Sequence, residues 1–142
     1  MRHKRPTILI DTREKNPIQF ESIKTEKATL KSGDYSLKGL VSDVVIERKS
    51  LQDLFGSFLS GSLEKQFSKM KNKKIKALLI EGKIATIILG DPFTKADGRA
   101  VLKNVLELCF KYNVIPLFSE DRMSSQELVK AFLISAEKYL KK

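Results

Sequence analysis

The stretch from residue 44 to residue 49 reads Val44-Val45-Ile46-Glu47-Arg48-Lys49, a β-branched apolar run that leads directly into three charged residues. This composition predicts a strand within residues 43–49. Because successive side chains of a strand point to opposite faces, Glu47 and Lys49 share one face and Arg48 lies on the other. An acid and an ammonium at this spacing could hold a hard cation and polarise a water, provided that another strand supplies a second carboxylate.

Other acidic residues stand at the polar ends of apolar strands. Asp11 and Glu14 follow the first apolar run of the chain, and Asp34 follows a flexible glycine. Asp34 is the first candidate for the second carboxylate, with Asp11 and Glu14 as further ones. Burying several acids together costs like-charge repulsion and desolvation unless a cation joins them. The alternative is that Glu47 and Lys49 are only a solvated pair on a surface strand.

The rest of the pattern predicts a mixed central sheet with helices on its faces, in the order β-β-β-α-β-α-β-α. The predicted strands are 7–10, a second one made of 28–31 and 35–38 with a turn or bulge signal at 32–34 between them, 43–49, 76–81 and 114–119, so three strands precede the first helix. The predicted helices are one from the N-cap Ser50 to Met70, interrupted by two glycines, one at 98–112, and one at 124–140 with a capping box of Ser124 and Glu127. Residues 84–89 are apolar but too few to assign.

The composition describes one basic domain over residues 1–142. The net charge is +10, with 42% hydrophobic and 31% charged residues, which is enough for a core and excludes intrinsic disorder. No apolar run approaches the about 18 residues of a membrane span, and the N-terminus lacks a signal peptide's hydrophobic stretch. We therefore expect an intracellular protein, in the cytoplasm with the nucleoid or in the nucleus. The positive excess favours nucleic acid as partner over an acidic membrane surface.

Metal chemistry is constrained by the scarcity of nitrogen and sulfur ligands. The chain has one cysteine and one histidine, so a thiolate cage and a histidine zinc site are both excluded. Any metal must be held mainly by carboxylates.

Three motifs together resemble the nuclease domain of the XPF family of structure-specific endonucleases, which includes archaeal Hef. They are Ile10-Asp11-Thr12-Arg13-Glu14, Gly33-Asp34-Tyr35, and Val45-Ile46-Glu47-Arg48-Lys49-Ser50-Leu51-Gln52-Asp53. The likeness continues through Gln66 and residues 78–82 into the final helix-strand-helix. It implies a restriction-endonuclease-like core of the PD-(D/E)xK type and hydrolysis of DNA phosphodiesters with Mg²⁺ or Mn²⁺, near branched structures such as flaps, forks and junctions.

The resemblance also implies roles for individual residues. Asp34 and Glu47 would be the main metal ligands, Asp11 a further ligand or a neighbouring acid, and Lys49 the residue that orients the attacking water. The Arg48 carbonyl could also face the metal, because Mg²⁺ takes oxygen ligands. The Arg48 side chain suits a phosphate, but it could equally pair with an acid at the edge of the core.

The remaining candidates have equally open alternatives. Glu14 and Asp53 complete the catalytic set, although Glu14 could only pair with Arg13 or a nearby lysine, and Asp53 could only cap its helix. Tyr35 is expected to pack. The lysines near the end of the first predicted helix could bind phosphates or form a solvated helix end. The candidate DNA contacts are Arg13, Arg48, Lys69, Lys73 and Lys74.

Two departures from the family pattern limit what can be carried over. The chain has Gly61-Ser62-Leu63 where family members often have Gly-Arg-Leu, so a DNA-facing or acid-pairing arginine is missing. The sequence also contains no helix-hairpin-helix module, so we expect branch recognition to be weaker, differently built or supplied by a partner. A nuclease for unbranched DNA and a non-catalytic DNA-binding scaffold are the alternative functions. The joint presence of four candidate catalytic charges argues against the scaffold.

Two apolar residues lie off the main apolar faces of the predicted C-terminal helices. They are Phe110 and Ile134, while Cys109 lies on a packed face as a buried thiol. Together with the pairing of nuclease domains that the resemblance implies, they predict a homodimer or heterodimer through these helices. The alternative is that isolated exposed apolar residues are ordinary.

Overall fold

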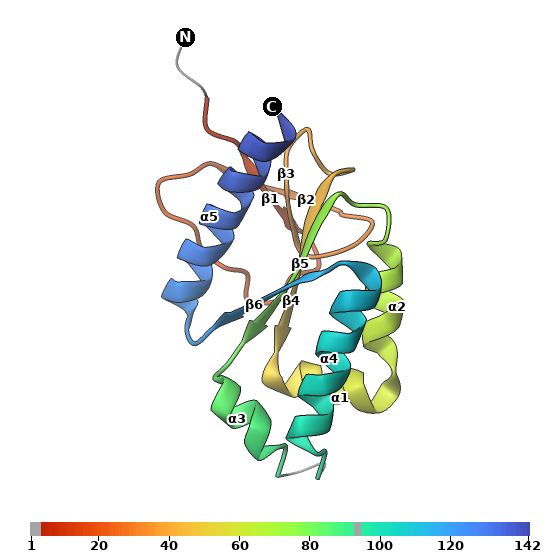
Figure 1. Cartoon of the computed structure of the whole chain (residues 1–142). Coiled ribbons are helices and arrows are strands. Elements are labelled where there is room, and N and C mark those ends of the chain that lie inside the picture. Colours follow the sequence, from red (N-terminus) through yellow and green to blue (C-terminus); the bar gives the residue numbers. More distant parts are fainter. Residues whose placement is uncertain (1–3, 93–94) are drawn as a thin grey trace.

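A six-stranded mixed sheet is the centre of the computed structural model, which describes residues 4–92 and 95–142 (Figure 1). The strands are β1 (Ile8–Asp11), β2 (Thr25–Ala28), β3 (Tyr35–Leu37), β4 (Val44–Ser50), β5 (Ile75–Glu81) and β6 (Ile115–Ser119). Their spatial order is β2-β1-β3-β4-β5-β6. The β1–β3 and β3–β4 pairs are antiparallel and the other pairs are parallel. The predicted mixed α/β architecture is therefore confirmed.

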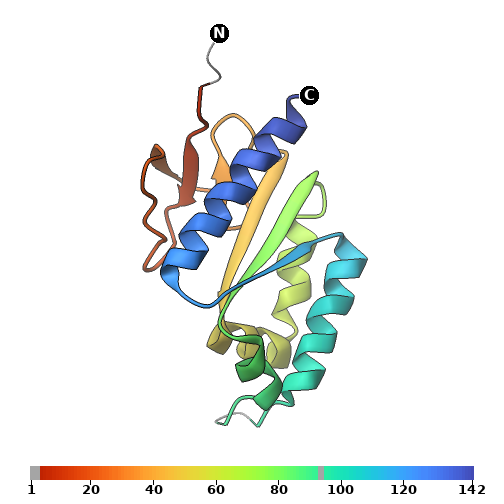
Figure 2. The ribbon, with the colours of Figure 1, turned by 60° about the vertical axis from the view of Figure 1, so that its left-hand side comes forward.

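Helices cover both faces of the sheet (Figures 1 and 2). They are α1 (Leu51–Ser60), α2 (Ser62–Lys69), α3 (Ile84–Leu89), α4 (Gly98–Tyr112) and α5 (Arg122–Leu140). Val45 and Leu78 pack in one buried cluster with residues of α1, α2 and α4. Ile46 and Leu79 pack in the second cluster, with α5. The alternation of β4 thus sends Glu47 and Lys49 toward the α1–α2 side and Arg48 toward the α5 side.

The structure corrects the prediction in the first third of the chain. Four strands precede the first helix, because β2 lies at Thr25–Ala28 and pairs in parallel with β1. Its alternately exposed and half-buried residues are mostly polar, as an edge strand allows, so they carried no hydrophobic signal. Ser50 caps α1 as predicted, with its side chain accepting from the Asp53 N–H. The predicted single helix ends at Gly61, whose φ of 73° is left-handed, and α2 begins directly after it.

Two other details differ from the expectation. The unassigned residues 84–89 form α3. The N-cap of α5 is Asp121, whose side chain accepts from the Ser124 N–H, so the predicted capping box of Ser124 and Glu127 is wrong by one turn. The described residues include no helix that combines the length and apolar character needed to cross a bilayer.

Candidate active site

Strand pairing places three acids side by side on one face of the sheet. Ile10 pairs with Tyr35, and Tyr35 pairs with Ile46, so the neighbouring residues Asp11, Asp34 and Glu47 come into register. The Asp11 N–H donates to the Asp34 carbonyl at 2.9 Å, and the Asp34 N–H donates to the Ile46 carbonyl at 2.8 Å. The predicted grouping of these acids is therefore a consequence of the β1–β3–β4 register.

Gly33 sets the position of Asp34. Its φ of +76° is left-handed, and a Cβ at this residue would lie 2.0 Å from Cγ2 of Val45. Both the backbone conformation and the space therefore require glycine. The sequence suggested that Gly33 provides flexibility, but in the structure it is held in close contact with β4.

Gly33→Ala should lower the free energy of unfolding by about 3 kcal/mol, because it adds left-handed strain and overpacks Val45. Gly39→Ala is the matched control: Gly39 also has a positive φ, 85°, but nothing lies within 4 Å of its Cβ position. The control carries only the backbone strain, so it should cost about 1 kcal/mol. Urea unfolding of both variants measures the difference, and equal losses would contradict the close contact.

The carboxyl groups of Asp34 and Glu47 form the centre of the site. Glu47 is only 9% exposed, and its carboxyl group lies beside that of Asp34. Burial, and then the neighbouring Asp34 charge, raise the pKa of Glu47 to about 9 from an ordinary 4.5, although the Lys49 ammonium opposes the shift. Asp34 Oδ2 also accepts the Arg48 N–H at 2.7 Å. Two acids are thus held together at a like-charge cost that a cation would relieve.

This donor set fits a hard divalent cation. Mg²⁺ is typically bound through one or two carboxylates and keeps several waters or phosphate oxygens, so the Asp34–Glu47 pair is sufficient. The described parts of the chain, residues 4–92 and 95–142, gather no group of three or more acids, histidines or cysteines that could hold a metal. Because Mg²⁺ takes six oxygen ligands, two carboxylates leave positions for waters or phosphate oxygens of the substrate, which suits an open site.

The metal-free protein, prepared with a chelator, should lose stability as the pH rises. The Glu47 pKa is higher in the folded state than in the unfolded chain, so its contribution is fully present below about pH 4.5 and is lost as the pH passes through about 9. Glu47→Gln should flatten this decline. Urea unfolding in EDTA from pH 5 to pH 9 measures it, and parallel curves for the two proteins would contradict the buried acid pair.

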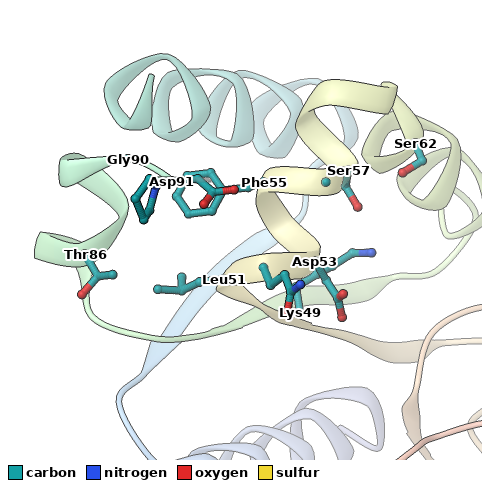
Figure 3. Close-up of a pocket in the computed structure, with 12 residues that line it drawn as sticks. Lys49, Leu51, Asp53, Phe55, Ser57, Ser62, Thr86, Gly90 and Asp91 are labelled. Carbon is teal, nitrogen blue, oxygen red and sulfur yellow. The ribbon is translucent and has the colours of Figure 1, made fainter. Parts of the chain in front are cut away.

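Lys49 lies on the same face, two residues along β4 from Glu47. Its side chain is buried, with 8% of its surface exposed, and its charge opposes the upward pKa shift of Glu47. The residue also lines a hollow of about 750 Å³ between α1 and α3, together with Asp53 (Figure 3). Asp53 is exposed, and its backbone N–H donates to the Ser50 hydroxyl at 3.1 Å. Ser50 is therefore the residue that caps the helix, and the carboxylate of Asp53 remains at the hollow.

Asp11 lies beside the acid pair but is occupied by other partners. Arg13 Nε donates to its carboxylate at 2.9 Å, and the Leu30 N–H donates at 2.8 Å. Burial alone would raise the pKa of Asp11, but these hydrogen bonds outweigh it and leave the pKa lowered. The partners of Asp11 favour the role of a neighbouring acid, and its role at a metal stays a prediction. Arg13 remains 66% exposed on its side chain, at the edge of the site.

Arg48 is embedded in a network on the opposite face. Its guanidinium pairs with Glu81 and, at 3.0 Å, with Glu14, and the Arg48 side chain is only 11% exposed. Tyr35 donates its hydroxyl to Glu14 at 2.6 Å. Of the two alternatives for the Arg48 side chain, the structure shows the pairing with acids, and contact of this guanidinium with a phosphate stays a prediction. Within residues 4–92 and 95–142, the ion pair of Glu14 is with Arg48 and not with Arg13 or a lysine, and Glu14 lies outside the acid pair.

Sequence reasoning missed Glu81 and Ser125 as parts of this network. Glu81 Oε2 accepts from the Ser125 hydroxyl at 2.6 Å, which links the network to α5. The position of Glu81 at the end of a predicted strand was an available signal, because β5 runs parallel to β4 and pairs Glu81 with Ser50. Tyr35 was expected only to pack, and it does contact Phe20 edge-on, but its hydroxyl also bonds Glu14.

Two of the three candidate DNA-binding lysines lie at the opposite end of β4 from Lys49. Ile75, which follows them, pairs with Val44 at the start of β4. Lys73 donates to the Val41 carbonyl at 2.6 Å, and Lys74 lies 3.9 Å from Asp43. Lys69, at the end of α2, is exposed. The structure brings none of the three into the acid pair, and their DNA contacts stay a prediction.

The fold and the site define a restriction-endonuclease-like domain with paired carboxylates and a lysine on neighbouring strands. The ERCC4 domain family matches residues 10–132, and the chain belongs to that family. The XPF from Aeropyrum pernix superposes with a TM-score of 0.78 at 17% identity, over 96% of this chain and 67% of that one. The Aeropyrum pernix XPF in complex with DNA gives 0.76 at 20% identity, over 94% and 66%. The family and fold predictions are confirmed.

Curated relatives extend far beyond the region that they share with this chain. DNA repair endonuclease UVH1 of Arabidopsis thaliana is 38% identical over 84 residues, which are 55% of this chain and 8% of that protein. A Methanocaldococcus jannaschii protein, whose assigned name describes an ATP-dependent RNA helicase, is 28% identical over 125 residues, 86% of this chain and 14% of that protein. The chain thus corresponds to a small part of each of these relatives.

Proposed function

We propose that this domain is a metal-dependent DNA endonuclease that cuts phosphodiester bonds near branched structures. The observation that carries the proposal is the buried Asp34–Glu47 pair with Lys49 two residues further along the same strand face. Membership of the ERCC4 domain family supports it. The name of UVH1, a DNA repair endonuclease, and the XPF solved with DNA support the same chemistry.

The proposed mechanism assigns a task to each side chain of the site. Asp34 and Glu47 would hold Mg²⁺ or Mn²⁺, with the Arg48 carbonyl as a further oxygen. A cation bound there would neutralise charge on the phosphate and make a water more acidic. The Lys49 ammonium would donate to the attacking water and orient it toward phosphorus. Asp11 and Arg13 would fix the C-terminal end of β1 beside Asp34, and Asp53 would contribute a further carboxylate at the mouth of the hollow.

The proposal is tested by a cleavage assay on flap, fork, duplex and single-stranded DNA, with Mg²⁺, with Mn²⁺ and with EDTA. We expect cutting of the branched substrates that requires a metal. Faster cutting of plain duplex or single strands would establish the alternative of a nuclease for unbranched DNA. If no substrate is cut with either metal, the endonuclease proposal is wrong and a DNA-binding scaffold takes its place.

DNA binding should weaken steeply with salt. Each phosphate that a cation neutralises on duplex DNA contributes about −0.9 to the slope of log affinity against log salt. Lys69→Ala should make the slope less negative by about that amount, whereas Lys138→Ala on α5, across the sheet, should leave it unchanged. Fluorescence anisotropy between about 50 and 200 mM salt measures the slope. A flat response of the unmodified protein would remove the electrostatic contribution to the proposal.

We also propose that the domain pairs through its C-terminal helices. Phe110 is 83% exposed and borders a hollow of about 580 Å³ with Ile88, Leu102 and Leu106. Ile134 is half-buried. An exposed aromatic beside an apolar hollow is a common interface anchor. Light scattering at micromolar concentration should show a dimer that Phe110→Glu dissociates, and a monomer that this change does not affect would contradict the pairing.

A further inference from the structure

A second hollow lies on the same face of the sheet as the acid pair, on the side away from Lys49. Its volume is about 260 Å³. Leu9, Ser36 and Val45 line it, and each precedes or follows one of the three aligned acids by two residues. Residues two apart in a strand share a face and lie about 7 Å from each other. The hollow therefore begins about one nucleotide step from Asp34 and Glu47.

The floor of this hollow is apolar and its rim is cationic. Leu9, Leu30 and Val45 are buried, with exposed fractions of 7%, 6% and 1%. Lys31 and Lys73 stand among the lining residues, Lys31 exposed and Lys73 half-buried. An apolar floor does not suit a phosphate, because burying that charge without partners is costly. A nucleotide matches both parts of this surface. Its flat base would lie on the apolar floor, and its phosphates would lie against the two lysines.

The lining also offers an unused polar group and a restricted size. Ser32 belongs to the lining, and its buried hydroxyl has no hydrogen-bond partner among the described residues. A nucleobase edge carries the donors and acceptors that such a hydroxyl lacks. Pockets for drug-sized ligands begin at about 300 Å³, so this hollow is suited to one small ring system. A DNA duplex is too wide to enter a hollow of this size.

We propose that the hollow receives one unpaired base, that of the nucleotide next to the phosphate held at Asp34 and Glu47. This inference rests on the proposed function and specifies its substrate as a strand whose base is free at the cut. In intact duplex the base is paired and stacked, and it must leave the stack to enter. At a flap or fork the base is already free. The hollow thus gives the nuclease domain itself a physical reason to prefer branched DNA.

The binding test uses a tetramer of thymidine nucleotides with no metal present. Its titration should shift the backbone amide signals of Leu30, Ser32 and Val41 in ¹⁵N-resolved spectra, and a short closed duplex should not. Val41 is 41% exposed at the mouth, so Val41→Glu adds a carboxylate there without disturbing the core. It should weaken tetramer binding about tenfold, within the range of losing one base contact. Leu59→Glu, at a 57% exposed position on α1, is the control and should not change it.

The cleavage test uses flap substrates with an abasic residue placed at each nucleotide around the cut. Loss of the base at one adjacent position should lower kcat/KM about tenfold for the unmodified protein, and Val41→Glu should add no further loss there. If all abasic substrates are cut equally well and the tetramer shifts none of the three amides, the hollow is not a base site although the endonuclease proposal stands. If no DNA is cut, that proposal fails, and the tetramer titration alone decides whether the hollow binds a base.

Discussion

Asp34→Asn should lower the rate of DNA cleavage by about 10³-fold or more at saturating metal. The substitution keeps the size of the side chain and its acceptor for the Arg48 N–H, which is bonded at 2.7 Å in the unmodified protein. It removes one of the two carboxylate charges that would hold the cation, and such electrostatic contributions are among the largest in catalysis. DNA affinity in EDTA should be equal or higher, because a negative charge near the phosphate is lost. Single-turnover cleavage and anisotropy separate the two effects.

Asp43→Asn is the matched control for this experiment. Asp43 precedes β4 at its other end and is partly exposed beside Lys74, so the same charge is removed away from the acid pair. Its cleavage rate should remain within about twofold of the unmodified protein. A comparable loss in both variants would indicate a general effect of charge. An active Asp34→Asn protein would exclude the proposed ligand role of Asp34.

Arg48→Met should lower the free energy of unfolding by about 3–5 kcal/mol. The change leaves Glu14 and Glu81 without their shared cation at side-chain exposures of 12% and 18%. Removing one partner of a buried ion pair is costly, since the other charge stays buried and uncompensated. The hydrogen bonds that Arg48 donates to Glu81 and Glu14 raise its pKa despite its burial, so the cation is present at every working pH. Urea unfolding at pH 7 measures the loss.

A surface ion pair of the same chain provides the comparison. Lys111 lies 2.6 Å from Glu64, but the two side chains are 64% and 43% exposed. Lys111→Met should therefore cost less than about 1 kcal/mol. If the two methionine variants unfold at the same urea concentration, then burial of the Arg48 ion pairs does not increase their contribution to stability.

The part of the site that could be predicted was the part encoded by alternation along single strands. The alternation of side chains along β4 alone was enough to place Glu47 and Lys49 on one face and Arg48 on the other. The bounds of α4 were predicted as observed, because the apolar residues of that helix are regularly spaced. The strand β2 was misplaced, since an edge strand that pairs on one side can be polar. Asp34 could be proposed as the second carboxylate, but its alignment with Glu47 depends on a β3–β4 register that single-strand periodicity does not define.

Partners that come from distant segments could not be predicted in the same way. The sequence left open whether Arg48 faces phosphate or an acid, and the choice is made by Glu81, which lies 33 residues further along the chain. The partners of Asp11, likewise, depend on the path of the loop that brings the Leu30 N–H to its carboxylate. Local pattern determines which face a side chain occupies, and the tertiary fold determines what it meets there.

The network around Arg48 changes how relatives and fragments of this domain should be judged. Every candidate catalytic residue lies between Asp11 and Asp53, so a fragment ending after α1 would retain all the motifs. Such a fragment would nevertheless lack Glu81 and Ser125, which hold Arg48 in place between Glu47 and Lys49. A sequence match confined to the motifs is therefore weak support for activity. An acid at the end of the following parallel strand should be required as well before a distant copy is assigned as a working nuclease.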